Sequence, residues 1–470
     1  MQFLPELTLL GAGLVIFLVS LGKTNADKIK TVAICLGAAV FVATLVSFRA
    51  QGHLFYDSYK IDLYSQVFKC LIAGAMFVVL ILGRKLKDIK NSVHPEYYLF
   101  LFISVLGLMM LVSSVELLAI FVALELSSFA VYIMVPMRDD SGNYRFQMEA
   151  GIKYLLFGVT ATGFMLFGMS YMFGLTGSTQ LPVVMEKLSY MYDQPAAIIA
   201  IMMVLAGFFY KLALFPFHFW VPDVYEGASN ETTAFIASVP KLAAVALLIR
   251  IVSMVNGEGQ IIVNILMVCA VLSMFYGNLS ALVQTDVKRM LGFSGIAHAG
   301  FVLLGILTFQ LSGYANALYY IIGYVVMNLA CFLVICSISN NGENVQICDL
   351  NGLHKRSPLL AITLAVALFA LAGIPPFVGF MGKFMLLTGA LKQGYLFLVI
   401  LAAINTAIAI FYYLSVVRVT FCSDPDNNNP VISGIFTNTT SIVLLLIIVI
   451  MGVAPQGFIN FATSAVQSIM

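Results

Sequence analysis

Apolar runs of about 18 residues or more recur along the whole sequence, and this recurrence constrains the fold more than any other feature. A run of that length with few charges can cross the hydrocarbon core of a bilayer as a helix. The runs are uniformly apolar and lack the alternation of period two that a membrane barrel needs, so strands are unlikely throughout. Fourteen runs are found, near residues 4–21, 29–49, 63–83, 97–113, 115–136, 150–174, 195–220, 231–254, 259–283, 290–310, 313–338, 359–391, 394–420 and 438–456. We therefore predict an all-α polytopic membrane protein with about 14 transmembrane helices.

Composition agrees with this class. Hydrophobic residues make up 61% of the 470 and charged residues 10%, whereas soluble domains are nearer half apolar and a quarter charged. The first run has no positively charged segment before it and no small-residue cleavage site after it, so we expect a retained span rather than a signal peptide.

Lysines and arginines near the span ends set the expected orientation, because cytoplasmic loops are enriched in these residues. Loops after odd-numbered runs hold fourteen basic residues, and loops after even-numbered runs hold five. We therefore expect the odd loops to face the cytoplasm. With fourteen spans, both termini would lie on the periplasmic side of a bacterial inner membrane.

Six charged residues lie inside the runs, although a charge at the bilayer centre costs about 2.5–3.5 kcal/mol. They are Lys69, Glu125, Lys153, Lys211, Lys241 and Lys383. Facing lipid, the six would cost roughly 15–20 kcal/mol together, more than the stability of a typical protein. We expect them to face a hydrated or ion-paired interior. Lys69 is the exception, because it lies nearer a span end and is expected to extend to the interface, so that its replacement by alanine should matter little.

Helix breakers interrupt two runs in their middles. One contains "YKLALFPFHFWVPD", with Pro216 after Lys211, and the other contains "LAGIPPFVGFMGKF", with Pro375 and Pro376 before Lys383. Proline removes a helical hydrogen bond, and in hydrocarbon the freed backbone groups must be satisfied by protein or water beside a cavity. A lysine near each break favours an ion path over a harmless kink.

The breaks lie in the seventh and twelfth runs, five spans apart. This spacing predicts two copies of a five-helix unit, runs 4–8 and 9–13, which the odd number of spans would place in inverted orientation. The expected organisation is an N-terminal three-helix segment (1–94), a first repeat (95–256), a second repeat (257–422) and a C-terminal helix (423–470).

Glu125 is the carboxylate deep inside a run, which makes it the natural partner of one buried lysine, and the sequence leaves open which one. A buried lysine can carry a proton because burial favours its neutral form and a nearby carboxylate favours its charged form. The alternative is a structural ion pair that locks two helices. Glu149 and Lys153 share a helix face at a spacing of four, so an interfacial salt bridge competes with a proton-carrying role for both.

Other polar residues offer weaker signals. His218 and His298 are candidates for proton relay, since histidine titrates near neutral pH, and the alternative of a helix–helix hydrogen bond stays open for both. Asp286, Lys288 and Arg289 predict a short polar loop that anchors the chain at the cytoplasmic face. The seven cysteines have no metal-ligand or disulfide spacing, and there is no phosphate loop or nucleophile triad, so chemistry on a soluble substrate is not indicated.

Seven stretches resemble the antiporter-like subunits of respiratory complex I. They are "LELSSFAVYIMV", "EAGIKYLLFG", "KLALFPFHFWVPDVYEGA", "ASVPKLAA", "QTDVKRMLGFSGIAHAGFVLLG", "NGLHKRSPLLA" and "LAGIPPFVGFMGKF", and they cover about residues 95–420 in order. Three features are typical of the N type of subunit, the counterpart of mitochondrial subunit 2. These are an end after run 14 with no lateral helix, a lysine at 383 where the M type has glutamate, and "ELSSFAVY". The first ~90 residues match only as generic spans.

The resemblance implies roles for the buried charges. Glu125 and Lys211 would form a carboxylate–lysine pair, Lys241 would be the bridging lysine, and Lys383 would be the second-half lysine near the exit. A charge change arriving from a neighbouring subunit would weaken the Glu125–Lys211 pair, and Lys211 would then pass its proton along hydrated groups.

Lys153 and His298 would be accessory members of that hydrated chain. The resemblance places NADH oxidation, flavin, iron–sulfur clusters and quinone in other subunits, so no cofactor is expected in this chain. The implied partners are the neighbouring antiporter-like and small membrane subunits and the lipid bilayer, with no nucleic acid.

Two other functions compete. A subunit of a multi-subunit Mrp-type cation/proton antiporter would share the broken helices and the lysine–glutamate pair, and would differ in its partners. A solute permease would need a substrate-sized cavity with aromatic or amide lining, which the lysine series and the single tryptophan, Trp220, fit poorly.

Overall fold

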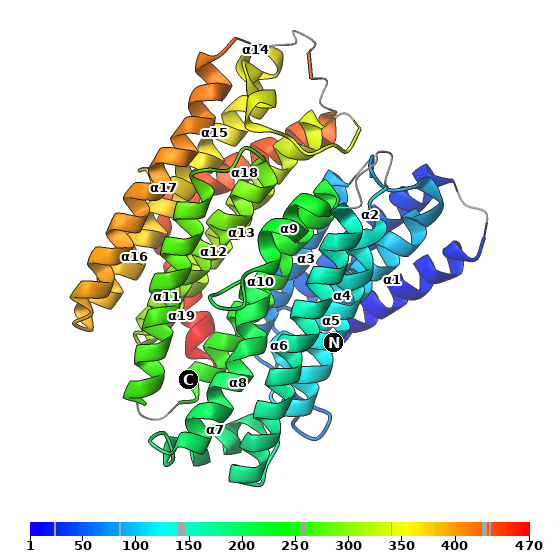
Figure 1. Cartoon of the computed structure of the whole chain (residues 1–470). Coiled ribbons are helices and arrows are strands. Elements are labelled where there is room, and N and C mark those ends of the chain that lie inside the picture. Colours follow the sequence, from blue (N-terminus) through cyan, green and yellow to red (C-terminus); the bar gives the residue numbers. More distant parts are fainter. Residues whose placement is uncertain are drawn as a thin grey trace.

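Long helices packed side by side form the structure (Figure 1). The computed structural model describes residues 1–22, 25–83, 86–139, 146–255, 259–339, 341–424, 430–431 and 434–470. Within these residues, 12 helices are long and apolar enough to cross a membrane, and α1 (Leu4–Ser20) and α15 (Pro358–Ala372) are apolar but shorter. The prediction of a helical polytopic membrane protein is confirmed, and the count of fourteen spans stays a prediction.

The N-terminal segment holds α1, α2 (Ala26–Val46) and α3 (Leu63–Leu82). Between α2 and α3 lies a hairpin of two short antiparallel strands, β1 (Gly52–Leu54) and β2 (Tyr59–Ile61), with His53 opposite Lys60. The expectation that strands are unlikely throughout is therefore wrong at this point. The hairpin lies between spans, where backbone groups are not confined to helical pairing as they are in hydrocarbon.

The next two groups of helices follow in sequence. The first consists of η1 (Asn91–Val93), α4 (His94–Ser113), α5 (Leu117–Met134), η2 (Val135–Met137), α6 (Phe146–Thr176), α7 (Leu181–Ser189), α8 (Pro195–Leu212), α9 (Trp220–Gly227) and α10 (Asn230–Ser253). The second consists of α11 (Gln260–Ala281), α12 (Val287–Ile306), α13 (Leu311–Ile338), η3 (Ile347–Leu350), α14 (Leu353–Arg356), α15, α16 (Val378–Lys392) and α17 (Leu396–Cys422).

Both predicted helix breaks are present, between α8 and α9 and between α15 and α16. Ala213 (φ 63°) and Gly373 (φ 87°) adopt the left-handed conformation that ends the first half-helix of each. The residue after each of these makes an equivalent backbone hydrogen bond. Leu214 N donates to Phe209 O (2.8 Å), and Ile374 N, 160 positions later, donates to Phe369 O (3.0 Å). Two segments of different sequence thus follow the same backbone path.

A second set of contacts recurs between α4 and α5 and between α11 and α12. Gly107 of α4 lies against the backbone of Ala123 and Ser127 in α5. Gly277 of α11, 170 positions later, lies in the same way against the backbone of Phe293 and Ala297 in α12. A Cβ atom at either glycine would lie within 2.8 Å of that backbone, so only glycine permits this approach. In this register, Gly295 occupies in α12 the position that Glu125 occupies in α5.

The two groups run in opposite directions. α11 is the fifth span after α4, and an odd offset reverses the direction of the chain. In Figure 1, α7 and α14, which follow the corresponding helices α6 and α13, lie at opposite ends of the molecule. The matching contacts at the two breaks and at Gly107 and Gly277, together with this reversal of direction, are those of an inverted repeat. The domain limits at 94, 256 and 422 stay a prediction.

The centre of the molecule is formed by α10, α12 and α13. In α10 and in α12, 94% of the most apolar stretch of 18 residues is buried. By contrast, only 33% of the corresponding stretch of α17 is buried. The C-terminal segment, predicted as one helix, holds two: α18 (Ile435–Val453) and α19 (Pro455–Gln467). Pro455 starts the second one, and Ser468 Oγ accepts a hydrogen bond from Tyr64 N (3.2 Å), which fastens the C-terminus to α3.

Candidate functional site

Glu125 and Lys211 lie in the first repeat, on α5 and at the end of α8. Both side chains are buried, at 8% and 3% exposure. Their charges act on each other, yet they form no ion pair within 4.0 Å, and Glu125 Oε1 and Lys211 Nζ have no hydrogen-bond partner among the described residues. Buried polar atoms without partners mark places where water can bind. The arrangement is a separated pair, in which water could bridge the two charges.

Lys383 lies at the second break, on α16, and is 3% exposed. Its Nζ donates to the carbonyl oxygens of Leu371 (2.9 Å) and Ala372 (3.2 Å), the last two residues of α15. The C-terminal carbonyls of a helix have no helical partners and carry partial negative charge, so they hold an ammonium well. The break thus supplies the binding site for this lysine.

Lys241 lies in the middle of α10, at the centre of the molecule, and is 2% exposed. Its Nζ donates to the Tyr324 hydroxyl on α13 at 2.9 Å and lies 5.0 Å from the centroid of that ring. A Cβ atom on Gly295 would lie 2.8 Å from Lys241 Nζ. The ammonium therefore occupies the space that glycine leaves in α12.

His298, on α12, connects the neighbourhoods of Lys241 and Lys383. Its Nδ1 lies 2.6 Å from the Tyr320 hydroxyl and its Nε2 lies 3.2 Å from the Tyr413 hydroxyl, and the charges of both lysines act on its ring. A histidine with hydroxyls on both nitrogens can accept a proton on one side and release one on the other. The same two bonds join α12 to α13 and α17, as the helix–helix alternative expected, and the relay role of His298 stays a prediction.

The sequence analysis missed the tyrosines of this region. Tyr320 and Tyr324 are four residues apart, so they share a face of α13, and Asn328 continues that face by one turn. This spacing was the available signal, and it is weak because tyrosine also packs in apolar runs. An aromatic cluster of the first repeat joins α6, α8 and α9 and consists of Tyr154, Tyr210, Trp220 and Tyr225. The Tyr225 hydroxyl there has no partner among the described residues.

Lys153 and Glu149 lie apart from Lys241, His298 and Lys383. Lys153 is 36% exposed, and its Nζ contacts Glu149 Oε1 (2.5 Å) and Asp223 Oδ2 (2.6 Å). Asp223 also pairs with Arg289 (3.2 Å). This is the interfacial salt-bridge network that the sequence left as the alternative, and an accessory role in proton transfer stays a prediction for both residues.

His218 lies in the first break with 0% exposure, and its ring centroid is 4.2 Å from that of Phe219 and 4.2 Å from that of Tyr276. Neither ring nitrogen has a hydrogen-bond partner among the described residues. The structure does not bring His218 into hydrogen-bond contact with Lys211 or Lys241.

Two expectations about charges near span ends are wrong. Lys69 does not extend to the interface: it is 0% exposed, and its Nζ is 2.7 Å from Glu6 Oε1, which is also 0% exposed. Asp286 and Lys288 do not form an exposed loop, because Asp286 caps the first turn of α12 and Lys288, fully buried, donates to Ala228 O (2.9 Å). In both cases another helix covers a side chain that lipid or water was expected to meet.

A further buried pair joins the N-terminal segment to α10. Arg250 is 0% exposed and donates through two nitrogens to Asp62, the N-cap of α3, at 2.8 and 3.0 Å. Burial acts to raise the pKa of Asp62, but the Arg250 guanidinium outweighs it and the net shift is downward. Charge-assisted bidentate bonds of this kind fix geometry, so this pair positions α10 against α3.

The described residues thus place His298 where the charges of Lys241 and Lys383 both act on it, with tyrosine hydroxyls on Lys241 and His298 and backbone carbonyls on Lys383. Glu125 and Lys211 form a separated pair. Among the residues that the structure describes, no group of three or more His, Cys, Asp or Glu side chains has metal-binding spacing. A row of buried amines with hydroxyl and imidazole neighbours can pass protons.

Comparisons with known proteins agree on the family. Residues 114–409 match the family model described as NADH:quinone oxidoreductase/Mrp antiporter, TM. The chain is 49% identical over 469 residues to "NADH-quinone oxidoreductase subunit N 2" of Opitutus terrae, covering 100% of this chain and 98% of the relative.

Solved structures show the same fold. A chain of respiratory complex I from Thermus thermophilus superposes with a TM-score of 0.83 at 27% identity, covering 98% of this chain and 99% of that one. A chain of the Mrp complex from Dietzia superposes with a TM-score of 0.87 at 18% identity, covering 100% and 96%, which shows the fold alone. This chain therefore belongs to the antiporter-like membrane subunits of NADH-quinone oxidoreductase, in the family of subunit N.

Proposed function

We propose that this chain is a membrane-arm subunit of a proton-pumping NADH:quinone oxidoreductase and conducts protons through its central buried charges. The observation that carries the proposal is the row formed by Lys241, His298 and Lys383, whose side chains are at most 4% exposed. Lys241 bonds the Tyr324 hydroxyl, His298 lies against the Tyr320 and Tyr413 hydroxyls and within the field of both lysines, and Lys383 bonds the carbonyls that end α15. Ionisable groups buried in a membrane protein without a carboxylate partner in contact are typical of substrate or ion paths.

The geometry suggests how protons move. A buried amine gains or loses a proton when the charge around it changes, so a shift in Glu125 or its hydration would alter the state of Lys211. Because the two charges are not in direct contact, water can carry the proton between them. Lys241, bonded to Tyr324, would then exchange protons with Lys211, and His298, on which the charges of Lys241 and Lys383 both act, would relay them to Lys383.

The proposal includes the setting of the subunit. Its partners would be the other membrane subunits of the complex, since the superposed chain belongs to respiratory complex I. NADH oxidation, flavin, iron–sulfur clusters and quinone reduction would take place in those partners, and this chain would bind no cofactor of its own. Its location would be a bacterial inner membrane, and its basic residues favour the odd loops in the cytoplasm and both termini in the periplasm.

An Mrp-type antiporter subunit is the second candidate, because the family model that matches residues 114–409 describes Mrp antiporters as well. The partners distinguish the two. Co-purification with flavin- and quinone-binding subunits supports the oxidoreductase, whereas co-purification with antiporter subunits alone supports the Mrp type.

Substitution of the central lysines tests the function. We expect Lys241→Ala and Lys383→Ala to assemble and to lose most proton pumping coupled to NADH oxidation in inverted membrane vesicles, because each removes a proton carrier from the row. Lys392→Ala is the matched control, since Lys392 is an exposed lysine on the same helix as Lys383. Full pumping by assembled Lys241→Ala and Lys383→Ala complexes would refute the proposed path.

A further inference from the structure

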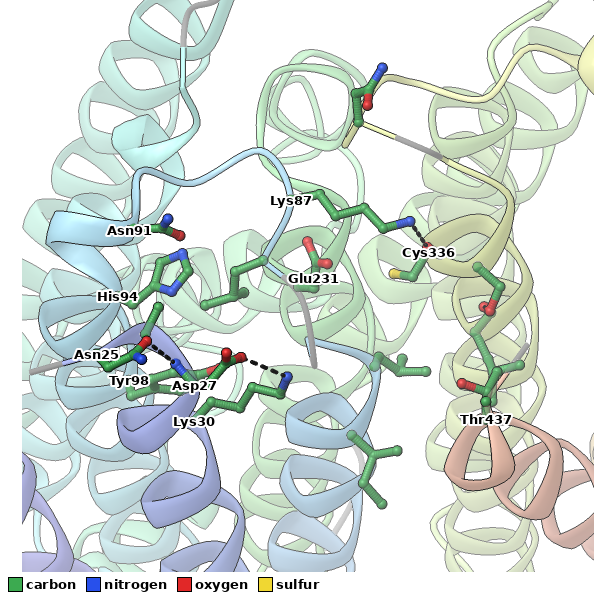
Figure 2. A pocket seen from close by; sticks show the side chains of 18 residues that line it. Asn25, Asp27, Lys30, Lys87, Asn91, His94, Tyr98, Glu231, Cys336 and Thr437 are labelled. Atoms are coloured by element: carbon green, nitrogen blue, oxygen red, sulfur yellow. Dashed lines mark hydrogen bonds and ion pairs between the residues drawn. The ribbon is translucent and has the colours of Figure 1, made fainter. Parts of the chain in front are cut away.

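A cavity of about 960 Å³ lies at one end of the molecule, away from the row of charges described above. It lies among α2, the loop after α3, α4, the start of α10, the end of α13 and the start of α18. Its polar wall includes Lys30, Lys87, His94, Glu231 and Ser337 (Figure 2). A lining this rich in charged and hydrogen-bonding groups is wetted by water, unlike the apolar cavities that stay dry.

Glu231 is the deepest acidic group on this wall. It lies in the first turn of α10, is 5% exposed, and its Oε2 has no hydrogen-bond partner among the described residues. A buried carboxylate oxygen without a partner is costly unless it binds water or a proton. Figure 2 shows Glu231 on the same cavity as Lys87 and His94.

Charged groups from several elements act on Glu231. They are Asp88 and Lys87 in the loop after α3, and Lys288 on α12. The charge of Glu231 in turn acts on Tyr97 and Tyr98 of α4. Burial raises the pKa of Asp88, more than Arg138 and Lys288 lower it. The carboxyl groups of Glu231 and Asp88 thus share one enclosed site, where nearby basic groups offset part of the cost of burying their charges.

The same two helices lead from this cavity to Lys241. On α10, Glu231 and Ser238 are seven residues apart and share a face, and Lys241 follows Ser238 by three, so Glu231 and Lys241 are about 15 Å apart along the helix axis. On α13, Cys336 lines the cavity and Asn328 lies one turn from Tyr324, the partner of Lys241. The buried Asn328 side chain acts on the Tyr324 hydroxyl, and its Nδ2 forms no hydrogen bond within 3.5 Å among the described residues, so a water can bind beside the two groups.

We propose that this cavity is a hydrated proton inlet and that Glu231 takes up protons from its water and passes them toward Lys241 between α10 and α13. Hydronium in the cavity would protonate the carboxylate, and the proton would then pass along water held by Asn328 to the Tyr324 hydroxyl, which would give its own proton to the neutral Lys241 amine and take one from that water. This proposal rests on the proposed function and adds a loading residue to it.

The first test substitutes Glu231. In the intact complex in vesicles, Glu231→Gln should lower the proton flux through this inlet by about 100-fold, because loss of a proton-transferring group typically costs that much or more. The number of protons pumped per NADH should fall, and Glu231→Asp, which keeps the carboxyl group, should restore most of it. Glu186→Gln, at an exposed position on α7, is the matched control and should pump normally.

The second test uses two native cysteines of α13. Cys336 lines the cavity, whereas Cys331, five residues away, is 0% exposed. A membrane-impermeant thiol reagent, read out by mass spectrometry of the intact complex, should modify Cys336 from one side of the membrane and leave Cys331 unmodified. Modification of Cys336 should also slow pumping.

The outcomes separate the inlet from the wider function. Normal pumping by Glu231→Gln, with Lys241→Ala inactive, would overturn the inlet and leave the proposed function standing. Normal pumping by both variants would overturn the function itself. A Cys336 as unreactive as Cys331 from both sides would show a closed cavity and refute the inlet. Loss of pumping in Glu231→Gln that Glu231→Asp does not restore would indicate a structural role for Glu231 and also overturn the proposal.

Discussion

Replacement of Lys69 by methionine tests how much a fully enclosed ion pair contributes to this membrane protein. Lys69 Nζ and Glu6 Oε1 are 2.7 Å apart and both side chains are 0% exposed. The Tyr59 hydroxyl donates to the same carboxylate oxygen at 2.7 Å. In Lys69→Met, the carboxylate of Glu6 would keep Tyr59 and lose its counter-charge.

The magnitude follows from that loss. Removing one partner of a buried ion pair costs about 3–5 kcal/mol, because the other charge is left buried without compensation. Each 1.4 kcal/mol is a factor of ten, so openings of α1 away from α3 that expose Glu6 should become about 100- to 5,000-fold more frequent. The double variant Glu6→Gln with Lys69→Met removes both charges and should recover most of this loss.

Hydrogen–deuterium exchange of the purified complex, followed by mass spectrometry, measures these openings directly. Peptides from α1 and α3 should exchange faster in Lys69→Met, and peptides from α12 should not change. Lys28→Met is the matched control, since Lys28 is an exposed lysine in the first turn of α2. Unchanged exchange in α1 and α3, or a double variant worse than Lys69→Met, would refute the reasoning.

Two further substitutions test other parts of the site. A Cβ atom on Gly295 would lie 2.8 Å from both Lys241 Nζ and the Tyr324 hydroxyl, so Gly295→Val should displace their hydrogen bond and reduce pumping per NADH in vesicles. Gly163→Val, at a glycine with nothing within 4 Å, should pump normally, and equal pumping by the two would contradict the crowding argument. Lys153→Ala removes a partly exposed ion pair, so it should change stability by only about 0–1 kcal/mol and leave pumping intact, as thermal unfolding and the vesicle assay can measure. A large pumping defect there would place Lys153 in the path.

Sequence patterns predicted the elements that hydrophobicity dictates. The long apolar runs located the helices, and the prolines located both breaks, because burial of apolar surface and loss of a backbone hydrogen bond are local properties. The hairpin at Gly52–Ile61 and the division at Pro455 were missed, since short turns add little to a window dominated by apolar residues.

The site was predicted less completely, because partners come from distant helices. Glu6 lies in the first turn of α1, and nothing in its local sequence indicates that α3 will place Lys69 against it. Tyr413, on α17, meets His298 only because α12 and α17 are neighbours in the folded chain. Lys211, Lys241 and Lys383 were identifiable because a charge in a span is conspicuous, whereas hydroxyls and enclosed carboxylates near span ends are not.

Glu125 of α5 and Gly295 of α12 occupy corresponding positions in the two copies of the five-helix unit, and this difference has an electrostatic consequence. Where the first copy has a carboxyl group, the second has only a hydrogen atom, and its lysine at the break, Lys383, lies against helix-end carbonyls instead. The duplicated backbone is therefore electrically unequal. A positive charge of the same size would meet a titratable partner in one copy and fixed backbone dipoles in the other.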